Sequence, residues 1–442
     1  MRSRRIVLSF LGCILLALNL AGWHQQRQNH LSAFIAISLV QGAVYLIAAW
    51  LVLRERQPLG SLAVVLAFAA LLRLTILFAP PYLSTDIYRY IWDGRVQAAG
   101  INPYRFVPAD PALQSLRDGD LYPRINRCDY AHTIYPPLAQ ALFLGITRVS
   151  ESVIWMKACM VAFEAVAVWM VLRLLALLGL PAERVLIYAW HPLTVWEFAG
   201  SGHIDAAAIA LLAIALWARQ HKFPVLTGIA LAGATLVKLY PAPLFPALYR
   251  RWDWKMPVAF LATLAAGYAP YLSVGRGVFG FLPGYIQEEG LKTGWGIYLL
   301  RALQNVAGER GMISAVYLAI ALVVMLAVVL WLVFRRESDN SWIRGGTALV
   351  VVFYVLVSPH YPWYFAWPLL LLTMVPYVPM LYLAAASFIL YETLLGQDAD
   401  VLFHLNTLLY LPFGLLVLVH AVAARLHARK TQFSTVGVSS GR

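Results

Sequence analysis

Apolar residues recur along the chain in long uninterrupted runs separated by short polar segments. The runs fall at roughly 5–22, 31–53, 60–80, 153–175, 184–200, 203–219, 224–249, 256–272, 312–334, 343–357, 363–376, 379–394 and 401–421. About 20 apolar residues suffice for a helix to cross a bilayer, and inside hydrocarbon the backbone must satisfy its own hydrogen bonds. The pattern predicts an all-α polytopic membrane protein with about 12 to 14 transmembrane helices and a helical outer loop between spans 3 and 4.

Two runs depart from simple spans. The run 224–249 contains Lys238-Leu239-Tyr240-Pro241, and proline breaks a helix because it lacks the amide donor and clashes with the preceding turn. We expect this run to enter and leave the membrane by the same face. The run 135–149 is short, and we expect a helix lying at the outer interface. With these two choices the unusual polar clusters of the chain all fall on one side of the membrane.

Composition agrees with a membrane protein: 61% of the residues are hydrophobic, only 12% are charged, and the mean hydropathy is +0.70. The net charge of +13 comes from basic residues scattered in short loops, which argues against a nucleic-acid partner. More than half of the 34 Lys and Arg residues fall on the side of the amino terminus, which we therefore assign to the cytoplasm. Three cysteines form no disulfide framework or zinc motif.

We expect one membrane-embedded domain over residues 1–430. It includes an extracytoplasmic catalytic loop at 81–136, where charged and aromatic residues interrupt the apolar pattern. Residues 431–442 are rich in small polar residues and are predicted to form a disordered cytoplasmic tail. No internal repeat or soluble domain is evident.

The loop contains two carboxylates that could act in catalysis. If Asp86 begins a helix, Asp86, Tyr90 and Asp93 share one face, and the two carboxylates lie about 10 Å apart along its axis. That separation is too large for both to hold one Mg²⁺ ion unless the helix is unwound. No metal and no cofactor are predicted. We expect one carboxylate to act as a general base and the other to orient a neighbouring group. The alternatives are that Asp86 caps the helix and that Asp93 pairs with Arg89 or Arg95.

Four cationic or potentially cationic side chains are candidates for binding a phosphate group. Arginine forms paired hydrogen bonds with phosphate oxygens, and a lysine beside a helix break can hold an anion. The candidates are Arg89, Arg95, Lys238 and His360. The alternatives are surface salt bridges for the arginines of the loop, including Arg127, snorkelling for Lys238 and an interfacial aromatic belt around His360.

Further candidates line the expected substrate pocket. These are Tyr90, Trp92, His203 and Asp205. His203 and Asp205 follow a Gly-Ser-Gly turn where a helix begins, so the helix dipole alone could also account for Asp205. Glu164 lies well inside its apolar run and is expected to be protonated or paired with a partner that the sequence does not specify.

Four stretches resemble a known family. The segment Ser84–Arg95, continued by Gly100–Tyr104, resembles the first outer loop of bacterial GT-C glycosyltransferases, particularly the polyprenyl-phosphate-mannose-dependent mannosyltransferases. The stretches Trp196–Ala206, Ala234–Pro241 and Ser358–Tyr364 resemble the same group. Two features depart from its commonest pattern: the acidic loop follows the third span instead of the first, and it has no adjacent acidic pair.

The resemblance implies an inverting glycosyltransferase that moves a hexose, by family pattern mannose, from a polyprenyl-phosphate donor to a hydroxyl of a glycan or glycolipid acceptor. The implied location is the cell (inner) membrane, in contact with membrane lipid, with the active site at the extracytoplasmic face. Asp86 then corresponds to the base. Lys238, His360, Arg89 and Arg95 would stabilise the leaving lipid phosphate.

A transporter or flippase for a lipid-linked or anionic substrate is the alternative class. Ion-coupled carriers also contain broken helices and intramembrane charges, such as Arg73, Glu164 and Lys238 here. The absence of an inverted repeat and the large polar outer loop argue against a carrier.

Overall fold

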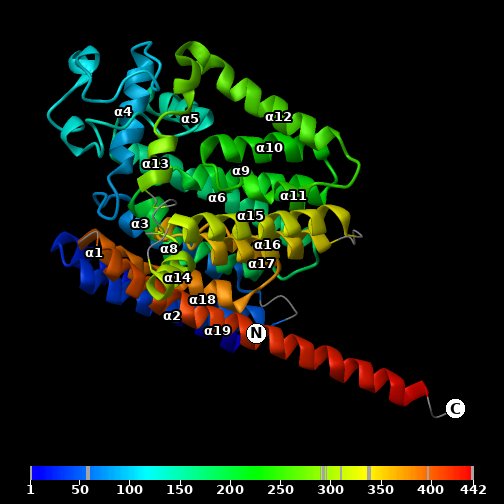
Figure 1. Ribbon diagram of the computed structural model, residues 1–442. Helices are drawn as coiled ribbons and strands as arrows, with labels where there is room; N and C mark the ends of the chain where they lie inside the picture. The colour runs from blue at the N-terminus through cyan, green and yellow to red at the C-terminus, as the bar shows by residue number, and fades with distance from the viewer. Residues whose placement is uncertain are drawn as a thin grey trace.

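The computed structural model describes residues 2–55, 60–288, 290, 294, 296–308, 311–335, 340–395 and 398–439. Every regular element in these ranges is helical, and they contain no strand (Figure 1). The prediction of an all-α chain is confirmed for this part of the protein.

The first half of the chain contains α1 (Arg2–Arg27), α2 (Leu31–Leu53), α3 (Leu62–Leu77), α4 (Asp86–Ala98), α5 (Pro137–Thr147), α6 (Val153–Leu177), α7 (Leu186–Ala189), α8 (Pro192–Thr194), α9 (Asp205–Gln220) and α10 (Pro224–Val237). The second half contains α11 (Phe245–Leu248), α12 (Lys255–Tyr268), α13 (Leu282–Glu288), α14 (Tyr298–Ala307), α15 (Gly311–Phe334), α16 (Ser341–Val357), α17 (Leu369–Met374), α18 (Val378–Ala386) and α19 (Ala399–Ser439). A π-helical segment, η4 (Val195–Gly200), and the 3-10 segments η1 (Pro111–Leu116), η2 (Tyr122–Arg124), η3 (Ala182–Val185), η5 (Ala242–Leu244), η6 (Ala269–Phe279), η7 (Pro362–Phe365) and η8 (Ser387–Leu395) join them.

Six described helical stretches are long and apolar enough to cross a membrane. They are Arg4–Arg27, Leu31–Leu53, Val153–Leu177, Lys255–Glu288, Gly311–Phe334 and Ala399–Ala423. Shorter apolar stretches lie at Leu62–Leu77, Pro137–Thr147, Pro224–Val237, Ser341–Val357 and Val378–Leu394. The chain is therefore a helical membrane protein, while the number of 12 to 14 spans stays a prediction.

The centre of the helical bundle is α9, which is rich in alanine. It packs against α6 on one side and α10 on the other, and α10 in turn packs against α12 (Figure 1). Small side chains allow helix backbones to approach closely, which is a common basis for helix packing in membranes. Most of α9 is buried, including its first residue, Asp205, which is therefore held in a fixed place within the bundle.

The expected break in the run 224–249 is present. Helix α10 ends at Val237, the backbone of Lys238 is extended, and regular helix resumes only in the short segments η5 and α11. Pro241 precedes η5 and has no amide hydrogen with which to continue α10. The short run after Tyr135 also forms the expected helix, α5, which begins with Pro137 at its first position.

A buried ion pair joins α3 to α6. The guanidinium of Arg73 donates from Nε and Nη2 to the two carboxylate oxygens of Glu164, at 2.9 and 2.6 Å. Its Nη1 donates to the carbonyl oxygens of Ala69 and Ala189. Both side chains are almost fully buried, and a buried charge is tolerated when it is paired and hydrogen-bonded. Arg73 is thus the partner of Glu164 that the sequence does not specify.

The chain between α3 and α6 forms a helical unit at one end of the bundle, drawn in light blue and cyan in Figure 1. Its main contact is between α4 and α5. A Cβ atom at Gly94 would lie 2.4 Å from Thr147 Oγ1 and 2.7 Å from the carbonyl oxygen of Phe143, so glycine is required for this close approach. The unit places the first turn of α4 beside the bundle.

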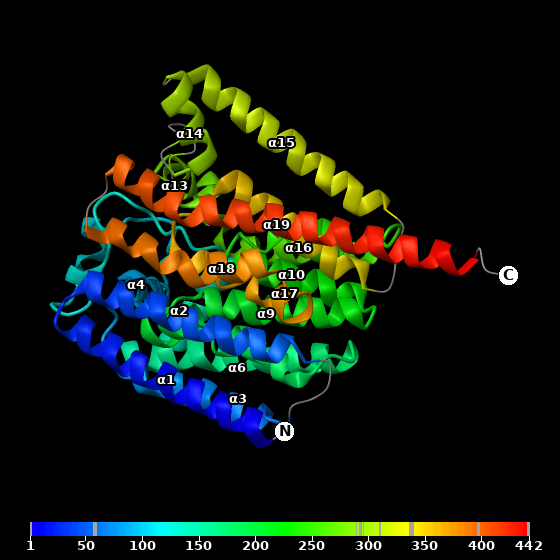
Figure 2. The same ribbon diagram turned by 90° about the horizontal axis from the view of Figure 1, so that it is seen from below.

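The carboxyl-terminal helix α19 runs past the bundle and away from it (Figure 2). It is helical to Ser439, and the disordered cytoplasmic tail from residue 431 stays a prediction. Residues 440–442 lie outside the described residues.

Candidate active site

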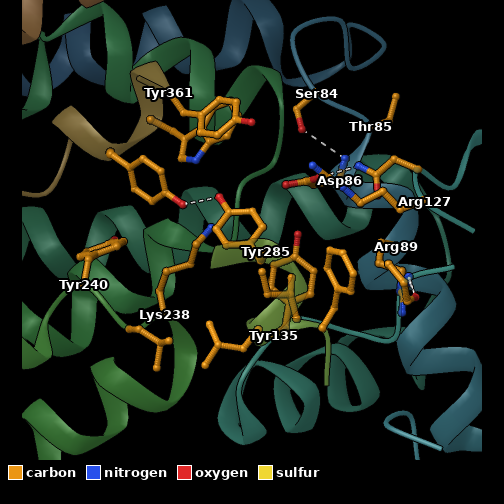
Figure 3. A pocket seen from close by; sticks show the side chains of 18 of the residues that line it. Ser84, Thr85, Asp86, Arg89, Arg127, Tyr135, Lys238, Tyr240, Tyr285 and Tyr361 are labelled. Atoms are coloured by element: carbon orange, nitrogen blue, oxygen red, sulfur yellow. Dashed lines mark hydrogen bonds between the residues drawn. The ribbon is translucent and has the colours of Figure 1, made fainter. Parts of the chain in front are cut away.

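A cavity of about 720 Å³ lies between the first turn of α4, the break after α10, helix α13 and segment η7 (Figure 3). One part of its wall is polar and contains Asp86, Arg89, Asn126, Arg127 and Lys238, and the other part is largely aromatic. Large cavities that combine an apolar lining with a few convergent polar groups are typical of substrate-binding sites. Asp86 is the one carboxylate among the described residues that line this cavity.

Asp86 is the first residue of α4, after the N-cap Thr85. Its backbone amide lies 3.2 Å from Ser84 Oγ, and its carboxylate oxygen Oδ1 accepts a hydrogen bond of 2.8 Å from Asn126 Nδ2. The carboxylate therefore does not serve as the side-chain cap of the helix. It is half-buried and lines the cavity, where a bound molecule can reach it.

The electrostatic surroundings keep Asp86 ionised. Burial acts to raise its pKa, but the neighbouring His203 and Lys238 and the hydrogen bond from Asn126 lower it more, so the pKa lies below its usual value. The hydroxyl of Tyr135 acts in the same direction. An ionised carboxylate in a partly enclosed cavity can accept a proton from a bound hydroxyl group.

Lys238 enters the cavity from the break after α10. Its ammonium Nζ lies 3.0 Å from Asp205 Oδ2 at the start of α9. The same nitrogen lies 5.8 Å from the ring centroid of Tyr135 and 5.9 Å from that of Tyr364, within reach of cation–π attraction. Asp205 is fully buried, so it orients Lys238 from behind and does not itself line the cavity.

Arg89 and Asp93 form the ion pair that the sequence offered as an alternative. Arg89 Nε lies 2.8 Å from Asp93 Oδ1, and its Nη1 donates to the carbonyl oxygen of Ala131. The other carboxylate oxygen of Asp93 accepts from Thr133 Oγ1 at 2.5 Å and from Gln140 Nε2 at 2.9 Å. Asp93 is thus buried in a network that joins α4 to α5. Arg89 reaches the cavity lining, whereas Asp93 does not.

Two predicted phosphate ligands lie elsewhere. The guanidinium of Arg95 is bound by Asp118 at 2.5 Å and Glu151 at 2.6 Å, and Arg95 does not line the cavity. His360 is buried after the end of α16 and is also absent from the lining. Burial lowers the pKa of its imidazole to about 4, so it carries no positive charge at neutral pH.

Three further predicted pocket residues are buried and do not line the cavity. Tyr90 is buried in a stack on Phe143, with ring centroids 4.6 Å apart, and Trp92 is buried against the ring of Tyr122. His203 is buried with its ring edge on Trp363. Tyr90 and His203 contact residues of the lining, namely Tyr135 and Trp363, whereas Trp92 packs away from it.

The structure adds three residues that sequence reasoning did not single out for the site: Asn126, Arg127 and Tyr135. Arg127 does form the salt bridge expected for it, with Nε 2.9 Å from Glu288 Oε2, yet it also lines the cavity. Asn126 reaches Asp86 across 40 positions of the chain, and no local pattern marks it. Tyr135 precedes Pro136 and Pro137. This proline pair predicts the start of a helix and gives no indication that Tyr135 belongs to the site.

No group of three or more His, Cys, Asp or Glu side chains in the described ranges is arranged to hold a metal ion. The fold and the cavity define a helical membrane protein in which an ionised carboxylate shares a cavity with three cationic side chains and an aromatic wall. This combination is typical of an enzyme site that binds an anionic group beside a neutral one.

Comparison with known proteins identifies the family. The model of the family described as "Alpha-(1->6)-mannopyranosyltransferase, N-terminal domain" matches residues 12–252, more than half of the chain. The chain therefore belongs to this family and is a glycosyltransferase. The resemblance to bacterial mannosyltransferases of the GT-C type is confirmed.

Two relatives bear the name alpha-(1→6)-mannopyranosyltransferase A. The protein from Mycobacterium tuberculosis is 22% identical over 377 residues, which cover 78% of this chain and 72% of the relative. The protein from Corynebacterium glutamicum is 26% identical over 381 residues, which cover 74% and 76% respectively. No solved structure gives a significant match to the chain.

Proposed function

We propose that the protein transfers a mannosyl residue from a polyprenyl-phosphate donor to a hydroxyl group of a glycan or glycolipid acceptor. The family and the names of the two relatives support mannosyl transfer and an α-1,6 linkage. The observation that carries the proposal is the meeting of Asp86, Lys238 and Arg127 in one cavity of a membrane-embedded bundle.

Each of these side chains has a distinct role in the proposed reaction. Asp86 accepts the proton of the acceptor hydroxyl while the hydroxyl oxygen attacks the anomeric carbon of the donor. The bond between that carbon and the phosphate oxygen breaks, and the lipid phosphate leaves with the electron pair. Lys238 and Arg127 stabilise its negative charge, and Arg89 lies at the edge of the same wall.

The single carboxylate of the lining favours inversion of configuration. A retaining mechanism of the glycosidase type needs a second carboxylate about 5 Å away as nucleophile, and Asp86 has no such companion among the described lining residues. A single displacement through Asp86 is the simplest reaction for this arrangement. The apolar residues of the lining, such as Leu239 and Leu394, suit the isoprenoid chain of the donor.

We assign the cavity to the extracytoplasmic face of the cell membrane. More than half of the Lys and Arg residues lie on the opposite side in the predicted topology, which follows the positive-inside rule. In a variant without the three native cysteines, a cysteine at the exposed Tyr130, next to the lining residue Ala131, should react with a membrane-impermeant maleimide in intact cells. A cysteine at Trp252, in the exposed turn before α12, should react only after the membrane is opened.

The reaction is tested with purified protein, polyprenyl-phosphate mannose and octyl α-mannoside as acceptor. We expect release of the free polyprenyl phosphate together with an elongated mannoside. Asp86→Asn should reduce turnover by about 10² to 10⁴ while donor binding is retained. Near-normal turnover of this variant would remove Asp86 from the role of base. Movement of the donor across the bilayer without cleavage would instead indicate a transporter.

A further inference from the structure

The cavity contains a cluster of aromatic rings for which the mechanism above has no use. Tyr361, Trp363 and Tyr364, on and just before η7, all line the cavity, and we call them the aromatic shelf. The rings of Tyr361 and Trp363 are stacked, with centroids 4.6 Å apart and planes inclined by 12°. All three side chains are half-buried, whereas Pro362 and Phe365 between and beside them are buried. The shelf therefore presents its rings to the cavity.

The shelf is fixed from several sides. The ring of the buried His203 lies edge-on to Trp363, with centroids 4.8 Å apart. The hydroxyls of Tyr364 and Tyr285 are 2.8 Å apart, as the dashed line in Figure 3 shows, and this contact joins η7 to α13. The hydroxyl of Tyr354 donates to the carbonyl oxygen of Tyr364. A surface held in this way loses little conformational entropy when a ligand binds.

The chemistry of the shelf suits a neutral sugar ring. One face of a pyranose carries C–H groups that pack on aromatic rings, whose faces are electron-rich. The tyrosine hydroxyls and the indole N–H supply hydrogen-bonding groups for the sugar hydroxyls. The three side chains carry no charge, so they offer a phosphate no opposite charge to pair with. An isoprenoid chain could pack on the rings but could not use their polar groups.

The position of the shelf indicates which sugar it receives. Tyr364, at one end of the shelf, adjoins the wall with Lys238, whose Nζ lies 5.9 Å from its ring centroid. The stacked rings of Tyr361 and Trp363 share the cavity lining with Asp86. In the view of Figure 3, Tyr361 and Asp86 both lie above Lys238. A sugar on the shelf can thus direct a hydroxyl at Asp86 while the donor phosphate occupies the wall with Lys238 and Arg127.

We propose that the aromatic shelf is the acceptor subsite and binds the terminal pyranose of the glycan to which the mannosyl residue is added. This inference rests on the proposed transferase function. It assigns Tyr361 and Trp363 to recognition of the acceptor by stacking. The part of the wall with Lys238 and Arg127 serves the donor.

The test separates the two substrates kinetically. Trp363→Leu should raise the KM for octyl α-mannoside about three- to tenfold, the effect expected for the loss of one aromatic contact. The KM for polyprenyl-phosphate mannose should stay within about twofold of the wild-type value, because Lys238 and Arg127 are unchanged. Trp363→Phe keeps a ring and should recover most of the loss. Trp169→Leu is the matched control, because Trp169 is exposed on α6, and it should change neither constant.

The outcomes distinguish failure of this inference from failure of the proposed function. An active wild-type enzyme in which Trp363→Leu raises the KM for the donor alone would assign the shelf to the donor and overturn the inference. An unchanged acceptor KM would also overturn it. If Trp363→Leu does not fold, Tyr361→Leu and the graded change in Trp363→Phe give the same readout. A wild-type protein that cleaves no donor with any acceptor would instead overturn the function.

Discussion

The ammonium of Lys238 lies 3.0 Å from the carboxylate of Asp205, although the two residues are 33 positions apart and belong to different helices. Lys238 ends α10 in extended conformation and Asp205 begins α9, so the pair joins a helix break to a helix start. Asp205 is fully buried and Lys238 faces the cavity. The buried carboxylate thereby fixes the cation that we assign to the donor phosphate.

Asp205→Asn should leave Lys238 charged but poorly oriented. We expect kcat/KM for the donor to fall about tenfold or more, as is usual when one partner of a buried charged hydrogen bond is removed. In a double-mutant cycle with Lys238→Met the two losses should not add, because both remove the same interaction. Steady-state kinetics of the two single variants and the double variant measures these losses in kcat/KM. Asp129→Asn, at an exposed residue between α3 and α6, is the control, and additive losses would contradict the coupling.

The pH dependence of the reaction should report the lowered pKa of Asp86. A base must be ionised, so activity is present above its pKa and is lost as pH falls through it. We expect kcat/KM to show no carboxylate-dependent loss until the pH is below about 4, the usual carboxyl range. Lys238→Met removes one of the causes of the lowered pKa and should move this acid limb to higher pH. A pH–rate profile of both proteins makes the comparison, and coincident limbs would contradict the assignment.

Arg73 and Glu164 should act as a single unit in stability. Arg73→Met leaves the Glu164 carboxylate buried without its partner and should destabilise the protein by about 3–5 kcal/mol. The double variant Arg73→Met/Glu164→Leu should recover much of this loss, because an apolar pair needs no compensation for lost water. Thermal unfolding in detergent measures both variants. A double variant less stable than Arg73→Met would show that the pair has no such coupling.

Gly94→Ala should disturb the contact between α4 and α5. The added methyl group would lie 2.7 Å from the backbone carbonyl oxygen of Phe143, which cannot move without shifting α5. We expect a loss of about 1–3 kcal/mol and reduced turnover, because α4 carries Asp86. Gly145→Ala in α5 is the matched control: its Cβ would meet nothing within 4 Å, and the helix should gain about 0.5–1 kcal/mol. Equal effects of the two variants on the melting temperature would contradict this account.

Local patterns predicted the elements that carry the site better than the site itself. Asp86 at the start of a helix, the break at Lys238 and the ion pair of Arg89 with Asp93 all depend on neighbours within a few residues, so they can be read from spacing. Arg95 and Arg127 are alike in sequence terms, since both lie in the same polar loop. Asp118 and Glu151 hold Arg95 away from the cavity, whereas Arg127 lines it.

The sequence by itself determined that the chain is a helical membrane protein, because continuous apolar runs leave the backbone no other way to satisfy its hydrogen bonds. It also indicated Asp86 and Lys238 as site residues, because charge is scarce in such a chain. Only the tertiary structure decided which partners they meet. Asn126, Arg127 and the aromatic shelf reach them from distant segments, and such contacts follow from the packing of whole helices, which no local spacing encodes.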